Sequence, residues 1–269
     1  MIKEHWPLKS LEETAALSVW ADSGADRIQA GRLAERLGLP MVQGQPAHGL
    51  TLRFGAHGLE LCCTRSGADV LCLRGDFTRM LPRLQPGSLQ RELLVRAARI
   101  RRPTGRLVAI DATAGLGEDA MLLAAAGFSV QLYESNPVIA ALLADALDRA
   151  AGVPALAPVV SRMQLHETDS LTALLKLSAS SDVILLDPMF PARHKSALVK
   201  KKLQLLQMLA CPCADEAALL MAAIAARPRK VLVKRPLKGA CLAGIQKTYP
   251  KLLNNFENRN LNTIFQIYL

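Results

Sequence analysis

The sequence predicts an α/β fold in which helices cover a mainly parallel sheet, preceded by a small α+β domain. Three observations support this prediction. From Arg106 onward, short apolar segments alternate with helical segments, which is the pattern of a parallel sheet. A glycine-rich turn follows the first of these apolar segments, where α/β sheets bind ligands. With 51% hydrophobic and 21% charged residues in a chain of 269, a core for one large and one small domain can form.

Residues 1–87 are expected to form the small α+β domain. A helix is predicted from about Ala25 to Leu37, because Gly38 and Pro40 stop it. Short apolar segments separated by glycine-containing turns follow, and such segments are typical of strands. The predicted strands are Leu50–Phe54, Leu59–Cys63 and Val70–Leu73.

Residues 88–269 are expected to form the larger domain, after the chain break at Pro86-Gly87. Ser88 is predicted to cap a helix over Leu89–Ile100. Strands and helices then alternate to the end of the chain. The predicted strands are Leu107–Asp111, Phe128–Tyr133, Met163–His166, Val183–Leu186, Lys230–Val233 and Thr263–Leu269, and the predicted helices are Asp119–Ala126, Pro137–Ala150, Lys195–Leu209 and Asp215–Ala226.

Composition excludes several classes of protein. The sequence has no run of 18 apolar residues, so we expect no membrane span, and its first ten residues lack a signal-peptide pattern. The 6 cysteines contain no Cys-x-x-Cys pair and lack the spacing of a disulfide framework. We therefore expect buried thiols, no metal site and a reducing, cytoplasmic location.

Charge is segregated along the chain. The net charge of +10 divides into +6 for residues 1–106, −7 for 107–190 and +11 for 191–269. Clustered Lys and Arg favour a polyanionic partner, because they neutralise phosphates and release counterions. The acidic middle segment instead favours a cationic small molecule.

The glycine-rich turn predicts a nucleoside site. Gly115 and Gly117 let the backbone turn tightly and approach a ligand closely at the carboxyl edge of the sheet. Gly115-x-Gly117-x-x-Ala120 also fits the dinucleotide fingerprint, and Glu134 follows the next strand, where an acid would bind a ribose hydroxyl. The turn alone leaves the nucleoside open.

Asp111 favours S-adenosylmethionine over a dinucleotide. It ends the first strand, where its carboxylate would repel a pyrophosphate but attract the ammonium and sulfonium of S-adenosylmethionine. Glu118 and Asp119 add negative charge at the start of the next helix, where they also suit the helix dipole. The sequence thus favours a methyltransferase, with a nicotinamide-dependent oxidoreductase as the alternative.

A second segment supplies the candidate catalytic residues. Asp187, Pro188, Met189 and Phe190 follow the strand Val183–Leu186, and they resemble the Asp/Asn-Pro-Pro-aromatic segment of methyltransferases that modify exocyclic amines. The nitrogen of such an amine is a poor nucleophile, because its lone pair is delocalised into the ring. A carboxylate and a backbone carbonyl that accept its N–H bonds would help it become tetrahedral, while an aromatic ring stacks on the base.

Several longer motifs resemble the RsmJ family, bacterial methyltransferases of guanine N2 in small-subunit ribosomal RNA. The resemblance rests on Asp-Ala-Thr-Ala-Gly-Leu-Gly at 111–117, Glu-Ser-Asn-Pro at 134–137, Asp-Pro-Met-Phe-Pro at 187–191 and Lys-Ser-Ala-Leu-Val-Lys-Lys at 195–201. It implies a class I S-adenosylmethionine-dependent methyltransferase (Rossmann-like) fold behind a small N-terminal domain. The cofactor contacts that it implies are Glu118, Asp119, Glu134, Ser135, Asp169, Ser170 and Asp187.

Basic residues near the same sheet edge form a candidate phosphate-binding rim. The partner expected there is small-subunit ribosomal RNA, either alone or within a 30S particle. A non-catalytic RNA-binding protein on the same fold is a further alternative. The candidate RNA-binding residues are Arg193, Lys195, Lys200, Lys201, Lys234 and Arg235.

Overall fold

A computed structural model describes residues 17–22, 25, 27–64, 70–103, 105–177, 181–188, 205, 209 and 216–236, and the backbone of 263–268. The chain divides into two compact units: the smaller contains Met1–Gly75 and Ser196–Met208, and the larger contains Asp76–Lys195 and Leu209–Leu269. No helix among the described residues is long and apolar enough to cross a membrane.

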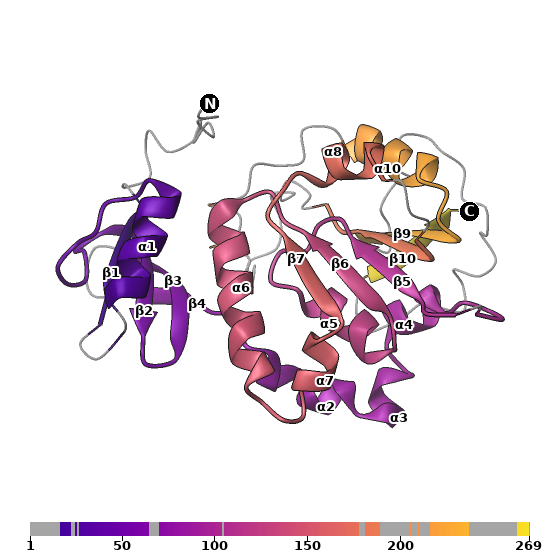
Figure 1. Cartoon of the computed structure of the whole chain (residues 1–269), viewed down its shortest axis with the longest axis horizontal. Coiled ribbons are helices and arrows are strands. Elements are labelled where there is room, and N and C mark those ends of the chain that lie inside the picture. The colour runs from indigo at the N-terminus through magenta and orange to yellow at the C-terminus, as the bar shows by residue number, and fades with distance from the viewer. Residues whose placement is uncertain are drawn as a thin grey trace. The chain divides into compact units, whose positions relative to one another are not determined.

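Within the part that the structure describes, the smaller unit contains a four-stranded sheet and a helix between its first two strands (Figure 1). The strand order is β1-β2-β3-β4; β1 is parallel to β2, and the other neighbouring strands are antiparallel. The sequence did not predict β1, which is four residues long. The elements are β1 (Ser18–Ala21), α1 (Arg27–Leu37), β2 (Gly49–Gly55), β3 (Gly58–Thr64) and β4 (Val70–Leu73).

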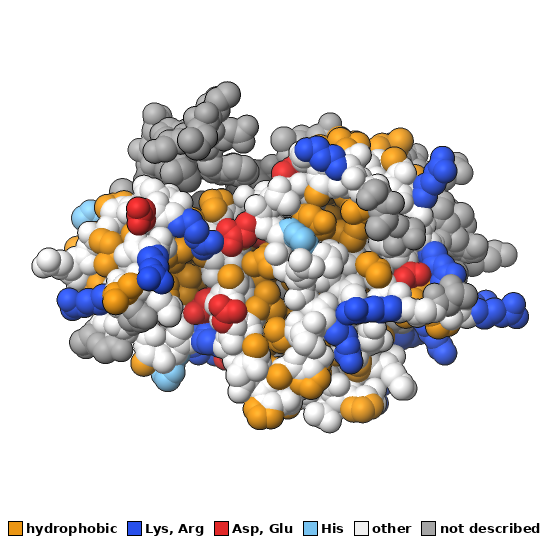
Figure 2. All heavy atoms as spheres, in the orientation of Figure 1, with side chains coloured by type: hydrophobic (Ala, Val, Ile, Leu, Met, Phe, Trp, Pro, Cys, Tyr) orange, Lys and Arg blue, Asp and Glu red, His pale blue; other side chains and the backbone are white. Residues whose placement is uncertain are grey.

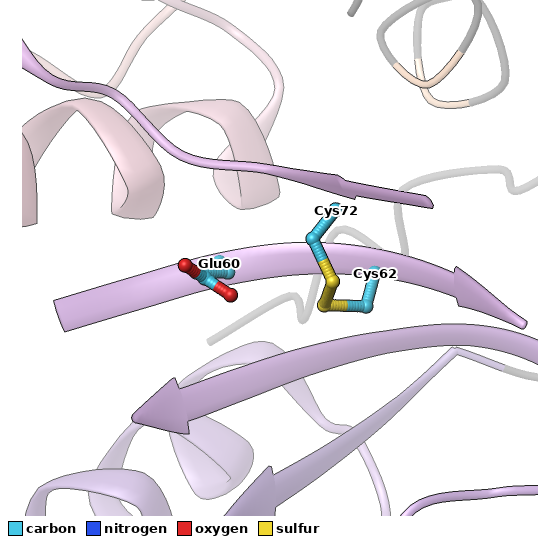
Figure 3. Close-up of side chains that lie close together, drawn as sticks. All are labelled: Glu60, Cys62 and Cys72. Atoms are coloured by element: carbon cyan, nitrogen blue, oxygen red, sulfur yellow. A yellow bond between two sulfur atoms is a disulfide. The ribbon is translucent and has the colours of Figure 1, made fainter. Parts of the chain in front are cut away.

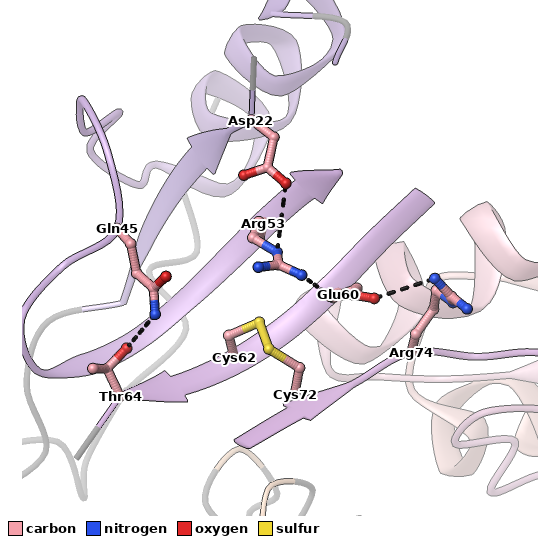
Figure 4. Close-up of a disulfide and its surroundings, with 8 residues drawn as sticks. All are labelled: Asp22, Gln45, Arg53, Glu60, Cys62, Thr64, Cys72 and Arg74. Carbon is pink, nitrogen blue, oxygen red and sulfur yellow. Dashed lines mark hydrogen bonds and ion pairs between the residues drawn. A yellow bond between two sulfur atoms is a disulfide. The ribbon is translucent and has the colours of Figure 1, made fainter. Parts of the chain in front are cut away.

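Cys62 and Cys72 form a disulfide, which differs from the thiols expected at these positions (Figure 4). They are directly opposite each other on β3 and β4, with 4.1 Å between their Cα atoms, so the strand register brings the two side chains together. Cys63 is a buried free thiol.

Glu60 lies beside the disulfide but does not complete a metal site with it (Figure 3). Both sulfur atoms are bonded to each other, and the Glu60 carboxylate is 2.7 Å from Arg53 Nη2 and 3.2 Å from Arg74 Nη1. Arg53 also reaches Asp22 at 4.0 Å, which extends this ion-pair network across the sheet (Figure 4).

The larger unit is a six-stranded sheet of order β10-β9-β8-β5-β6-β7, in which only β10 is antiparallel to its neighbour (Figure 1). The strands are β5 (Val108–Asp111), β6 (Ser129–Tyr133), β7 (Met163–His166), β8 (Val183–Leu186), β9 (Lys230–Pro236) and β10 (Thr263–Tyr268). The helices are η1 (Phe77–Met80), α2 (Leu81–Leu84), α3 (Pro86–Leu89), α4 (Leu93–Ala98), α5 (Glu118–Ala125), α6 (Pro137–Ala151), α7 (Ala157–Val160), α8 (Ser170–Leu175) and α10 (Glu216–Ala225).

Two apolar cores lie on the two faces of this sheet. Alternate residues of a strand point to opposite faces, so Leu185 packs in the core under α4, α5 and α6, whereas Ile184 and Leu186 pack in the core under α8 and α10. Every strand of the centre of the sheet is therefore apolar on both faces, as the sequence predicted for a covered parallel sheet.

Two details near the division of the units differ from the sequence prediction. Phe77 and Met80 pack in the core of the larger unit, so we place the division near residue 76 rather than after residue 87. The helix predicted over Leu89–Ile100 begins only at Leu93, because Glu92 has an extended conformation (φ −60°, ψ 129°). The helix predicted over Lys195–Leu209 lies mostly outside the described residues.

Candidate active site

The candidate active site lies where the strand order of the larger sheet reverses. The chain runs from β5 outward to β6 and β7, and then returns on the other side of β5 through β8 and β9. At such a switch point the loops after the two central strands diverge and leave a crevice for ligands. Two hydrogen bonds tie the loop after β5 to β8 and to the residue that follows it: Ala112 N donates to Leu185 O at 3.0 Å, and Asp187 N donates to Thr113 Oγ1 at 2.7 Å.

Asp111, at the end of β5, is a buried carboxyl group with 2% of its surface exposed. Thr113 N donates to its Oδ1 at 3.2 Å. Burial raises the pKa of Asp111 to about 8, and the negative charges of Asp119 and Asp187 act in the same direction. A cation bound beside Asp111 would favour its ionised form.

Lys234 lies between two carboxylates of the same crevice. Its Nζ is 2.6 Å from Asp119 Oδ2 and 2.9 Å from Asp187 Oδ2. Burial lowers the pKa of Lys234, but the two carboxylates outweigh this effect and raise it above its ordinary value, so the side chain is charged. Asp119 belongs to α5, Asp187 follows β8 and Lys234 belongs to β9, so three elements bring these groups together.

The two glycines of the turn have different roles. Both have positive φ values, 55° for Gly115 and 75° for Gly117, which favour glycine. A Cβ at Gly117 would lie 2.8 Å from Leu143 Cδ1 and 3.2 Å from Phe77 Cζ, so the absence of a side chain lets the turn pack on the core. At Gly115 the nearest atom would be Thr113 O at 4.0 Å, so a ligand can approach the backbone there.

Glu134 follows β6 and holds two loops with its carboxylate. Oε2 accepts from Gly115 N at 3.0 Å, and Oε1 accepts from Asn136 N at 2.8 Å. Burial raises the pKa of Glu134, while its backbone hydrogen bonds lower it. A carboxylate has about four acceptor positions, so Glu134 can still accept from the hydroxyls of a ribose. Ser135, next in the chain, is exposed.

Asp169 acts as a helix cap in the structure. Its Oδ2 accepts from Thr172 N at 2.8 Å and from Thr172 Oγ1 at 2.7 Å, which satisfies the start of α8. The neighbouring Ser170 is buried. Glu118, at the start of α5, is exposed at the other side of the turn.

The remaining predicted site residues fall into two groups. Pro188 is buried, and Arg235 is 11% exposed with its Nη1 3.4 Å from Glu216 Oε2. The others lie outside the described residues. They are Met189, Phe190, Arg193, Lys195, Lys200 and Lys201.

Sequence reasoning missed two residues that shape the site. Thr113 accepts from the backbone of Asp187, 74 residues away in the sequence, and nothing local signals that bond. Asn136 caps α6 by accepting from Val138 N at 3.0 Å and Ile139 N at 3.2 Å. An Asn directly before a proline at a helix start is a recognisable signal for such a cap.

The residues of the crevice fit S-adenosylmethionine. Among the described residues, the ends of β5, β6 and β8 and the start of α5 carry four carboxyl groups, and the ammonium of Lys234 contacts two of them, which suits a ligand that carries an ammonium and a sulfonium. The open backbone at Gly115 and the spare acceptor positions of Glu134 suit its nucleoside. The four carboxyl groups belong to Asp111, Asp119, Glu134 and Asp187.

Comparisons with known proteins identify the class to which this fold belongs. Residues 32–268 match the family model described as "Putative SAM-dependent methyltransferase". A SAM-dependent methyltransferase from Neisseria gonorrhoeae has a crystal structure similar to this one, with a TM-score of 0.64 and 27% identity over 94% of this chain and 96% of that chain. The fold is that of a class I S-adenosylmethionine-dependent methyltransferase, and the protein is an enzyme of this class, as the sequence predicted.

Curated relatives narrow the class to one family. Proteins named "Ribosomal RNA small subunit methyltransferase J" from three bacteria are similar to this chain. The Marinobacter nauticus protein is 40% identical, over 85% of this chain and 84% of its own length, and the Nitrosococcus oceani protein is 39% identical, over 89% of this chain and 93% of its own length. The Alkalilimnicola ehrlichii protein is 44% identical, over 80% of this chain and 83% of its own length. The chain belongs to the ribosomal RNA small subunit methyltransferase J family. Membership confirms the resemblance and favours methyl transfer over hydride transfer.

Proposed function

We propose that this enzyme transfers a methyl group from S-adenosylmethionine to the exocyclic N2 amine of a guanosine in small-subunit ribosomal RNA. The observation that carries the proposal is the placement of Asp187. Its carboxylate lies at the switch point of the sheet, 38% exposed, with its backbone held by Thr113 and one oxygen held by Lys234. The names of the curated relatives support ribosomal RNA of the small subunit as the substrate.

Asp187 has the chemistry that an aromatic amine requires. The amine donates both N–H bonds to acceptors, and this draws its lone pair out of the ring and toward the incoming methyl group. Among the described residues, Lys234 contacts Oδ2 of Asp187 and none contacts Oδ1, so Oδ1 is placed to accept from the amine. The following Pro188 restricts the backbone whose carbonyl would accept the second bond. Phe190 would stack on the guanine.

When bound, S-adenosylmethionine would supply an electrophilic methyl group, whose bond to sulfur would break as its bond to the substrate nitrogen forms. We assign its nucleoside to Glu134 and the backbone at Gly115, and its cationic part to the side of the crevice that carries Asp111. These residues hold the methyl group and the amine in line, which lowers the entropic part of the barrier. The proton of the methylated amine leaves to solvent.

RNA is proposed to approach across the carboxyl edge of the sheet. The strongly basic segment 191–269 supports this docking side, since it contains 14 basic and 3 acidic residues. A base buried in folded RNA would have to be exposed or flipped to reach the crevice. The proposed substrate is small-subunit ribosomal RNA in the cytoplasm, either alone or within an assembled or assembling 30S particle.

Transfer of a tritiated methyl group to small subunits from cells that lack this protein tests the proposal. We expect labelling by the natural enzyme, at N2 of a single guanosine when the RNA is mapped by mass spectrometry. Asp187→Ala should abolish labelling and leave RNA affinity nearly unchanged, whereas the exposed Asp148→Ala should change neither. RNA binding without labelling by the natural enzyme would identify a non-catalytic RNA-binding protein instead.

A further inference from the structure

We infer that Lys234 is a positioning residue that fixes the orientation and the charge of the Asp187 carboxylate for methyl transfer. The inference rests on the proposed function, in which Asp187 accepts from the substrate amine. It departs from the sequence-based hypothesis that Lys234 binds an RNA phosphate.

The sheet itself brings Lys234 to Asp187. Leu186, the last residue of β8, is paired with Val233 of β9; Asp187 directly follows β8, and Lys234 is the next residue of β9. Leu185 and Leu232, two residues before them, both pack in the core under α5. Because strand residues two apart share a face, Asp187 and Lys234 lie on the α5 side of the sheet. Hydrogen-bonded backbone therefore sets their 2.9 Å contact.

Asp119 fixes the ammonium from a third direction. Its carboxylate accepts from Lys234 Nζ at 2.6 Å, and it lies in the first turn of α5, which packs on the same core. A lysine side chain is flexible, so a single partner would leave its ammonium free to rotate. Two partners on separate elements hold Nζ in place, and thereby hold Oδ2 of Asp187.

The charges of the crevice make this contact necessary for an ionised Asp187. Burial raises the pKa of Asp187 above its ordinary value, Lys234 offsets part of this rise, and the negative charge of Asp119 adds to it. Without the ammonium, burial and the carboxylate of Asp119 would further favour a protonated Asp187, which is a poorer acceptor for an amine.

The same geometry disfavours a phosphate contact. The Lys234 side chain is only 30% exposed, and two of its three donors are directed at carboxylates. A phosphate reaching Nζ would approach Asp119 and Asp187, both of which repel it. An RNA-binding lysine is expected to extend its ammonium into solvent instead.

A carboxyl titration measures the charge of Asp187 without relying on activity. The probe is the ¹³C chemical shift of labelled aspartate side chains, with the Asp187 signal identified by its loss in Asp187→Asn. In Lys234→Met the midpoint of Asp187 should rise by about 1–3 pH units, because an opposite charge at this distance lowers a carboxyl pKa by about that much. Lys234→Arg should keep the midpoint near that of the natural enzyme, and Asp119→Asn should lower it.

The rate of methyl transfer gives the second readout. The acidic limb of the kcat/KM profile should move to higher pH in Lys234→Met, with kcat reduced more than KM is raised. RNA affinity should keep its dependence on salt, because no phosphate contact is lost. If Lys234 contacts a phosphate, the slope of log affinity against log salt should instead become shallower by about 0.7–0.9, and that result would overturn the inference.

The outcomes separate this inference from the proposed function. If the natural enzyme labels RNA but Lys234→Met changes neither the Asp187 midpoint nor the pH profile, the role of Lys234 is wrong. If the midpoint moves as expected but the natural enzyme never labels RNA, the proposed function fails and the contact stands. Should Lys234→Met not fold, the unchanged Asp187 midpoint expected for Lys234→Arg and the lowered midpoint expected for Asp119→Asn still decide the question, and equal midpoints in both would overturn the inference.

Discussion

Asp111 is buried at the centre of the larger sheet, and its protonation couples folding to pH. Its pKa of about 8 in the folded protein lies above the ordinary value of 3.8. Between these values the folded chain holds a proton that the unfolded chain has lost. The stabilisation is complete below pH 3.8 and is lost as the pH rises through about 8, so ionising Asp111 costs stability.

Asp111→Asn is therefore expected to weaken the dependence of stability on pH. The asparagine keeps the acceptor for Thr113 N but cannot ionise. Over pH 4–8, the free energy of unfolding of the variant should fall less steeply, by up to about 1.4 kcal/mol per pH unit. Urea unfolding at a series of pH values measures this slope. Parallel pH curves for the two proteins would show that Asp111 ionises normally in the folded state.

At the scale of single residues, the sequence predicted where the site residues lie better than it predicted what each of them does. Asp111, Glu134 and Asp187 all lie at the sheet edge, because each follows an apolar strand that local patterning reveals. The role of Lys234 depends on partners 115 and 47 residues away in the sequence, and no local pattern encodes such contacts. The packing reason for Gly117 has the same origin, since the atoms it avoids come from η1 and α6.

Helix starts explain much of the local order around the site. Asn136 begins α6 and Asp169 begins α8, each by accepting from backbone N–H groups of the first turn. Both helices follow strands whose ends line the ligand edge of the sheet. A weakened cap there would loosen the loops that approach the ligand.

Asp169 allows its capping role to be separated from the predicted cofactor contact. Asp169→Ala should lower the free energy of unfolding by about 1 kcal/mol, whereas Asp169→Ser should retain it within a few tenths, because serine is also a good cap. Urea unfolding measures stability, and calorimetry measures the affinity for S-adenosylmethionine. If only the cap matters, Asp169→Ser binds the cofactor as well as the natural protein does. A large loss of affinity in a stable Asp169→Ser would instead confirm the contact.

Strand positions were easier to predict than helix boundaries. The strands β4, β7 and β8 have the bounds that the apolar runs indicated, since a buried strand is defined by its own side chains. The predicted helix over Leu89–Ile100 was too long because its sequence stays helix-compatible through Glu92, while the fold requires a change of direction there. The short β1 is defined by its pairing with β2, and the sequence of its four residues does not predict this pairing.

Over the whole molecule, the structure reproduces only part of the charge segregation found in the sequence. The acidic middle segment supplies the carboxyl groups of the crevice. Basic side chains of the described residues are spread over several places on one face (Figure 2). Lys234 and Arg235, however, contact carboxylates. Net charge alone therefore could not distinguish the Lys and Arg side chains that bind RNA from those that stabilise the site.

RNA affinity should fall linearly with salt on logarithmic axes. The expected slope is about −0.7 to −0.9 for each phosphate contacted, so six contacts would cost about 10³-fold or less between 50 and 200 mM salt. Filter binding of small-subunit RNA at four salt concentrations measures the slope. The affinity for S-adenosylmethionine in the same buffers is the internal control and should change far less. A flat RNA curve would contradict docking through phosphates.

The order of the strands also affects how the protein folds during translation. β9, which carries Lys234, pairs with β8 on one side and with β10 on the other, and β10 is made from residues 263–268. Translation proceeds from the N-terminus at roughly 5–20 residues per second. Until residues 263–268 emerge, one side of β9 is an unpaired edge that can recruit another nascent strand. Ribosome pausing within this interval would therefore favour aggregation rather than merely delay folding.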